Sequence, residues 1–99
     1  MRDILDIAGH KVATIGEDGK IHSTSGVELG HMGAESHILN KEGVAVGYFD
    51  ASGHVYRDTS YMGSIYLDGN VYDQGNNHVG KVVGDHMESG GAALLLLIR

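Results

Sequence analysis

Apolar residues recur along the chain in a short pattern that repeats about every seventeen residues. Each unit has a glycine, two variable residues, an apolar residue, usually another glycine, one more residue, a second apolar residue, a polar turn and a third apolar residue. The first apolar column holds Val12, Leu29, Val46, Met62 and Val79. The second holds Ile15, Met32, Phe49, Ile65 and Val82, and the third holds Ile21, Ile38, Val55, Val71 and Met87. Three columns that occur five times indicate a repeated structural unit.

The stretch between the second and third columns predicts a turn in each unit. It contains Glu17–Gly19 in the first unit, Asp50–Gly53 in the third and Asp68–Gly69 in the fourth. Stretches rich in Asp and Gly between apolar β-formers are typical of hairpin loops. A helical interpretation fails, because an interior helical glycine costs about 1 kcal/mol relative to alanine and no window sustains a 3.6-residue period. Each unit therefore predicts a β-hairpin.

The two ends of the chain resemble the two halves of one further hairpin. Residues 91–97 match the first strand of a unit, and Ile4–Asp6 match Ile38–Asn40. We therefore expect an all-β fold, a pseudo-symmetric ring or barrel of about six 17-residue β-hairpin repeats. Pairing of the N- and C-terminal strands, Ile4–Ile7 with Leu94–Ile98, would close it and remove exposed sheet edges. The alternative is an open β-solenoid with polar caps at its ends.

Two runs of the chain carry a family resemblance. They are GVAVGYFDASGHVYRD at 43–58 and MGSIYLDGNVYDQGNNHVGKV at 62–82. They resemble the four-fold β-flower family of small bacterial proteins, whose repeats similarly contain apolar-Gly-aromatic, Asp-Gly and Val-Tyr-Asp segments. The resemblance covers most of the chain and implies a symmetric all-β fold, with four units where six are expected here. It implies no activity.

Composition narrows the class of protein. The 99 residues fit one domain, 1–99, and the sixteen glycines are about twice the usual share. Those before core positions would let crowded strands approach each other, namely Gly30, Gly47, Gly63 and Gly80. No cysteine is present, which excludes disulfides, thiolate metal sites and a cysteine nucleophile. The net charge of −6 disfavours nucleic acid and anionic membrane surfaces as partners.

The apolar run Ala92–Ile98 is seven residues long, whereas a membrane-spanning helix needs about twenty. We expect this run to be buried in protein. The amino terminus alternates charged and apolar residues and has no export signal pattern. A cytoplasmic protein is therefore expected.

Three of the seven histidines occupy the position just before the third apolar column, namely His37, His54 and His86. In a closed ring these side chains would lie around the axis or the rim. Neutral imidazoles are ligands that zinc and nickel accept, so a divalent metal is the candidate cofactor. The alternative is that positions beside loops simply tolerate polar residues, and no HExxH spacing is present.

Four tyrosines predict a ligand-binding face. Tyr56 and Tyr72 follow the third column, and Tyr48 and Tyr66 flank the second. Because neighbours along a strand point to opposite faces, these rings would line the outer surface. Such a face suits a sugar, another small molecule or a protein partner, since a tyrosine offers apolar area and a hydroxyl at little entropic cost. The alternative is that tyrosine is simply a good strand former.

The aspartates lie mostly in predicted turns, where they would bond their own backbone. They are Asp18, Asp50, Asp58, Asp68, Asp73 and Asp85. No nucleophile or phosphate-loop motif is present. The sequence therefore predicts a non-catalytic binding or interaction module, with a histidine-based metal-binding protein and a small acidic hydrolase as alternatives. Units this short bury little alone, so a homo-oligomer is also expected.

Overall fold

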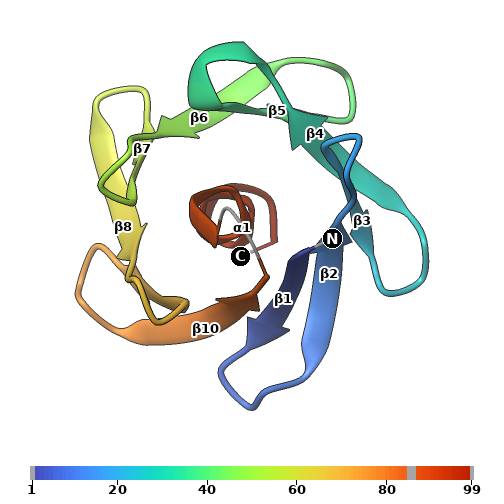
Figure 1. Ribbon diagram of the computed structural model, residues 1–99. Helices are drawn as coiled ribbons and strands as arrows, with labels where there is room; N and C mark the ends of the chain where they lie inside the picture. Colours follow the sequence, from blue (N-terminus) through green and yellow to red (C-terminus); the bar gives the residue numbers. More distant parts are fainter. Residues whose placement is uncertain (1, 85–86, 99) are drawn as a thin grey trace.

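Within residues 2–84 and 87–98, the chain forms a closed antiparallel barrel of ten strands around a C-terminal helix (Figure 1). The computed structural model describes residues 2–84 and 87–98. The strands are β1 (Arg2–Asp6), β2 (Lys11–Ile15), β3 (Lys20–Ser23), β4 (Glu28–Met32), β5 (His37–Asn40), β6 (Ala45–Phe49), β7 (His54–Arg57), β8 (Ser60–Ile65), β9 (Asn70–Asp73) and β10 (His78–Val83). A 3₁₀ turn, η1 (Ala34–Ser36), precedes β5, and α1 (Met87–Ala93) continues into the π-helix η2 (Leu94–Ile98). The expected all-β barrel is confirmed, with a helix added.

The barrel closes between its first and last strands. Each strand pairs with the next along the chain, and β1 also pairs with β10, where Ile4 lies opposite Val82. The expected pairing of Ile4–Ile7 with Leu94–Ile98 is wrong, because Leu94–Ile98 is helical and both neighbours of β1 are other strands. The count of six units is not confirmed, since the described residues hold ten strands.

Ile4 occupies the third-column position of the last hairpin, which the sequence pattern assigned to Met87. Ile4 lies opposite Val82, just as Ile21 lies opposite Ile15. The first strand of the chain therefore completes the hairpin that β10 begins. Met87 therefore does not belong to the sheet and is the first residue of α1.

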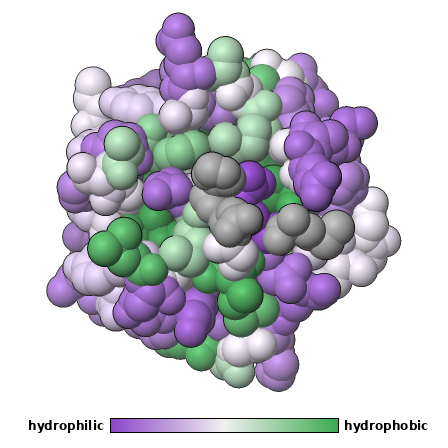
Figure 2. Space-filling view, in the orientation of Figure 1, coloured by the Kyte–Doolittle hydropathy of each residue, from purple (hydrophilic) through white to green (hydrophobic). Residues whose placement is uncertain are grey.

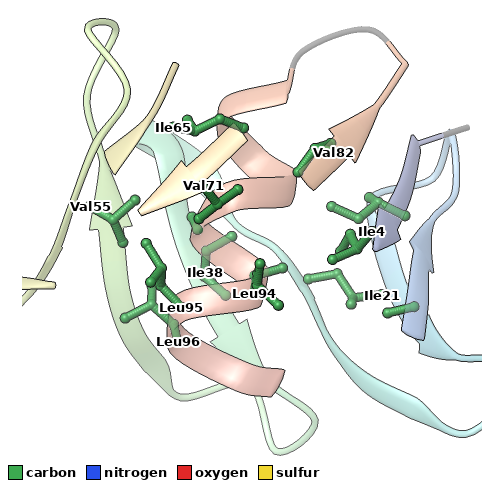
Figure 3. Close-up of a cluster of buried hydrophobic side chains, with 14 residues drawn as sticks. Ile4, Ile21, Ile38, Val55, Ile65, Val71, Val82, Leu94, Leu95 and Leu96 are labelled. Atoms are coloured by element: carbon green, nitrogen blue, oxygen red, sulfur yellow. The ribbon is translucent and has the colours of Figure 1, made fainter. Parts of the chain in front are cut away.

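The core lies between the barrel wall and the helix. The third-column residues point inward and are fully buried, namely Ile21, Ile38, Val55 and Val71, with Ile4 beside them. Residues Ala92–Leu96 of the helix are buried within this wall (Figure 3). A helix that is apolar on all sides is stable only when it is surrounded by protein. The leucine run is thus buried as expected, but as an axial helix.

Four barrel glycines each face a different residue of the leucine run. A Cβ added to the glycine would approach a leucine methyl to within 3 Å, in the pairs Gly80 and Leu94, Gly63 and Leu95, Gly47 and Leu96, and Gly30 and Leu97. The same Cβ would also clash with a backbone carbonyl oxygen of the next strand, which is that of Tyr56 in the case of Gly47. The expected role of these glycines in close strand approach is confirmed, and contact with the helix is a second reason for them.

The π-helical winding of η2 suits the arrangement of strands around it. Ten strands taken as five pairs divide the circle into steps of about 72°. Side chains of an α-helix step by about 100° per residue, and a π-helix, with its wider turn, steps by less. Consecutive leucines therefore meet consecutive strand pairs, from Gly80 back to Gly30.

Arg57 ties the end of the helix to the wall. Its guanidinium donates from Nη2 to the carbonyl oxygen of Leu96 over 2.9 Å. Helix C-terminal carbonyls lack intrahelical partners, and a cation there also interacts favourably with the helix dipole. In the part of the chain that the structure describes, no helix has the length and hydrophobicity to cross a bilayer.

Candidate functional site

Five aromatic side chains form a continuous row on the outer wall of the barrel, which we call the aromatic ladder. His37 of β5 lies 5.7 Å from Tyr48 of β6, measured between ring centroids. Tyr48 stacks on Tyr56 of β7 at 5.3 Å with an interplanar angle of 24°. Tyr61 of β8 lies 5.8 Å from Tyr56 and 6.0 Å from His54. The ladder therefore crosses four neighbouring strands.

Strand register brings these rings together. Tyr48 lies directly opposite both His37 and Tyr56 on its two neighbouring strands. The two-residue turn between β7 and β8 pairs Arg57 with Ser60 and so places Tyr61 opposite Tyr56. Side chains directly opposite on antiparallel strands are within contact distance. The sequence pattern did not indicate Tyr61, because Tyr61 lies outside the three apolar columns. The two-residue turn between β7 and β8 is the signal that would have indicated its place.

The ladder presents ring edges and hydroxyls. Because Tyr48 and Tyr56 stack face to face, part of each ring face is covered by the other ring. Both are half-buried, whereas Tyr61, on the last strand of the ladder, is 41% exposed. Aromatic pairs of this kind contribute about 0.5–1.5 kcal/mol beyond area burial. The ladder is thus a preorganised surface of apolar area with hydroxyl and imidazole groups.

Tyr66 and Tyr72 belong to a second aromatic cluster. Tyr66 lies 4.9 Å from Tyr72 of β9, which lies 5.3 Å from His78 of β10. Within residues 2–84 and 87–98, no ring contact joins this cluster to the ladder. The four tyrosines expected on one face therefore divide into two pairs.

The candidate metal-binding histidines lie at different places. His37 Nδ1 is 3.0 Å from the carbonyl oxygen of Ala34, and His54 Nδ1 is 3.4 Å from Oδ2 of Asp50. The row of tyrosines connects His37 to His54, and the described residues contain no group of three or more His, Cys, Asp or Glu side chains that would hold a metal ion. His86 lies outside the described residues.

The aspartates act as turn acceptors. Oδ1 of Asp50 accepts hydrogen bonds from the backbone N–H groups of Ser52 and His54, at 3.0 and 2.9 Å. The bond from the His54 N–H holds the pKa of the Asp50 carboxyl below its ordinary value. Similar backbone bonds are accepted by Asp18, Asp68 and Asp73. Their expected role in turns is confirmed. Asp58 has a positive φ of 55° in the β7–β8 turn, and Asp85 lies outside the described residues.

A cavity of about 530 Å³ opens at the rim of the barrel where α1 begins, and we call it the rim cavity. It lies between the β6–β7 loop, the β8–β9 loop and the start of the helix, and it is lined by Ala51, Ser52, Gly53, Ile65, Tyr66, Leu67, Asp68, Met87 and Glu88. Figure 2 shows hydrophobic surface beside polar surface on the side of the barrel that carries β8. The sequence did not indicate this cavity, because three separate segments form it.

Among the described residues, the aromatic ladder and the rim cavity are the two candidate ligand-binding sites. One lies on the outer wall and supplies rings and hydroxyls. The other lies at the rim and supplies apolar walls and carboxylates. Comparison of the chain with protein-family models, with curated proteins and with solved structures gave no match.

Proposed function

We propose that the protein is a non-catalytic interaction module that binds a polypeptide partner through the aromatic ladder. The observation that carries the proposal is the stacking of Tyr48 on Tyr56 within a row of five rings. A rigid row of tyrosines loses little side-chain entropy on binding, which is why tyrosine is enriched at recognition surfaces.

The size of the ladder fits a short peptide segment. Neighbouring strands lie about 4.8 Å apart, so a row across four strands spans about 14 Å. An extended polypeptide covers that length with about four residues. The ladder would thus contact one short segment of a partner rather than a whole domain face.

The chemistry of the ladder favours a polypeptide over a sugar. Stacking covers part of the ring faces on which a sugar would lie, and it leaves edges with hydroxyls. Tyrosine hydroxyls and neutral imidazoles both donate and accept hydrogen bonds, as the peptide backbone of a partner requires. The net charge of −6 would steer basic segments toward the protein.

The turn aspartates favour a binding role over a hydrolytic one. A hydrolase that works through an acidic residue pair needs two carboxyl groups that converge on a substrate with separated pKa values. Asp18, Asp50 and Asp68 each accept backbone hydrogen bonds of their own turns. These bonds give each of the three carboxylates a structural role in its own turn.

Selection from a random-peptide phage library on the folded protein tests the proposal. Peptides that are selected should contain basic residues, and their affinity should fall by about tenfold or more in Y56A and Y61A, because central aromatic residues dominate interface energies. Y72A, in the second aromatic cluster, is the matched control and should bind as the wild type does. Peptides that bind equally well to Y56A, or binding of glycans but not of peptides to this face, would overturn the proposal.

A further inference from the structure

The rim cavity has walls that are fixed by hydrogen bonds. The Ile65 N–H donates to the carbonyl oxygen of Gly53 at 2.9 Å, which holds the β6–β7 loop against β8. In the β8–β9 loop, the Gly69 N–H donates to Tyr66 O at 2.9 Å. A volume of about 530 Å³ lies within the range of about 300–1,000 Å³ that small-molecule sites occupy. The cavity is therefore preformed and large enough for a small organic molecule.

Apolar side chains form most of this cavity. Ile65 is buried, Met87 is half-buried at the start of α1, and Leu67 is 96% exposed. An almost fully exposed leucine beside a cavity makes no contribution to the core. A ligand that covered Leu67 would bury apolar area worth about 25 cal/mol per Å².

Both charged side chains that line the cavity are acidic, and Lys81 acts on one of them, Asp68, from outside the lining. Asp68 and Glu88 contribute carboxylates, and none of the nine lining residues that the structure describes is Lys, Arg or His. The N–H of Asn70 donates to Asp68 and lowers the pKa of the Asp68 carboxyl, so this group is charged at neutral pH. The phenol ring of Tyr66 can also attract a cation through its face. Charge complementarity therefore selects a cationic ligand.

We propose that the rim cavity binds a small organic amine, with its apolar body against Ile65, Leu67 and Met87 and its ammonium group at Asp68 and Glu88. This site is separate from the aromatic ladder. The proposal for the rim cavity therefore does not depend on whether the ladder binds a peptide.

Three matched probes test the charge preference. These are 2-phenylethylamine, 2-phenylethanol and 3-phenylpropanoate, which share a ring and differ in charge. The amine should shift the NMR signals of the Met87 methyl group and of the Ser52 and Gly53 amides, and it should bind about three- to fivefold more tightly than the alcohol for each exposed carboxylate it meets. The acid should bind most weakly. Equal binding of all three, shifts confined to other residues, or no shifts with the amine at millimolar concentration would overturn the proposal.

Variants separate the carboxylates from the apolar walls. D68N retains a turn acceptor, as Asn40 does in its own turn, and E88Q retains the side-chain size. Each should weaken the amine about three- to fivefold and leave the alcohol unchanged. The matched control is D18N, since Asp18 accepts the same kind of backbone bond in the β2–β3 turn, away from the cavity. If D18N weakened the amine as much as D68N does, only the overall charge would matter and the site would be excluded.

Discussion

Gly47 and Leu96 fit together because Gly47 has no side chain. A Cβ atom on Gly47 would lie 2.7 Å from Cδ1 of Leu96, closer than carbon atoms pack. Gly47 belongs to β6 and Leu96 to the helix on the barrel axis. The contact therefore connects the repeat pattern of the sheet to the C-terminal leucine run, and the following predictions depend on that connection.

Alanine at Gly47 should destabilise the fold. The added methyl group would clash both with Leu96 and with the Tyr56 carbonyl oxygen, and overpacking of this kind costs about 1–3 kcal/mol or more. G43N is the control, because Gly43 has a φ of 84° and open space around it, and asparagine tolerates that backbone conformation. Urea unfolding followed by circular dichroism measures both variants. Equal losses of unfolding free energy in G47A and G43N would argue against the close contact.

Truncation of Leu95 should leave a cavity in the core. Leu95 is 4% exposed between the helix and the wall, and Leu-to-Ala changes at such sites cost about 2–5 kcal/mol. L67A removes the same atoms from a side chain that is 96% exposed, and it should change the unfolding free energy by no more than about 0.5 kcal/mol. The comparison fails if L95A is as stable as L67A under thermal unfolding.

Loss of the Arg57 guanidinium should loosen the end of the helix. R57M keeps most of the aliphatic length but leaves the Leu96 carbonyl without this donor, at a cost of about 1 kcal/mol. Amide hydrogen exchange in Leu94–Ile98 should then be faster in R57M than in the wild type, with little change in the strands. R57K should recover part of the stability, because a lysine still carries a donor and a positive charge. Unchanged exchange in R57M would show that the bond does not hold the helix.

Asp50 should make stability depend on pH in the acidic range. Its folded-state pKa lies below the ordinary value of 3.8, chiefly because the His54 N–H donates to the carboxylate. The stabilisation is therefore present above about pH 4 and is lost as pH falls through the folded-state pKa. D50N retains an acceptor for the turn but carries no charge, so it should be less stable than the wild type at pH 7 and approach the wild type near pH 2. Unfolding curves of D50N and wild type that remain parallel from pH 6 to pH 2 would contradict the assignment.

The sequence predicts those features of the sheet that depend on neighbouring residues, namely its buried positions and its turns. The buried columns that contain Ile21 and Ile38, and the turns at Asp50 and Asp68, follow from alternation and turn chemistry. The course of the C-terminal run does not follow in the same way. A run of leucines is compatible with a buried strand or a buried helix, and only the space inside the barrel decides between them.

The candidate sites depended on features that are not local. Tyr61 joins the ladder because it pairs with Tyr56 across β7 and β8. The two pairs of tyrosines separate because Tyr66, just after β8, lies beside Tyr72 of β9. The rim cavity combines two loops with Met87, which the sequence pattern had placed in a strand. Contacts between distant segments determine each of these features, and a repeat pattern does not report them.

The account rests on the C-terminal segment being a helix packed against the inner wall, which a double-mutant cycle between Gly90 and Val82 tests most directly. A Cβ on Gly90 would lie 2.5 Å from Cγ1 of Val82, and V82A removes that atom. G90A should destabilise the wild type by about 1–3 kcal/mol through overpacking, although alanine is otherwise favoured over glycine in a helix by about 1 kcal/mol.

In the V82A background, the same G90A change should be neutral or stabilising, which gives a coupling free energy of at least about 1 kcal/mol between the two positions. The free energy of unfolding of the four proteins, measured in urea, provides this value. An equal effect of G90A in both backgrounds would mean that Gly90 does not contact Val82, and it would contradict a helix inside the barrel.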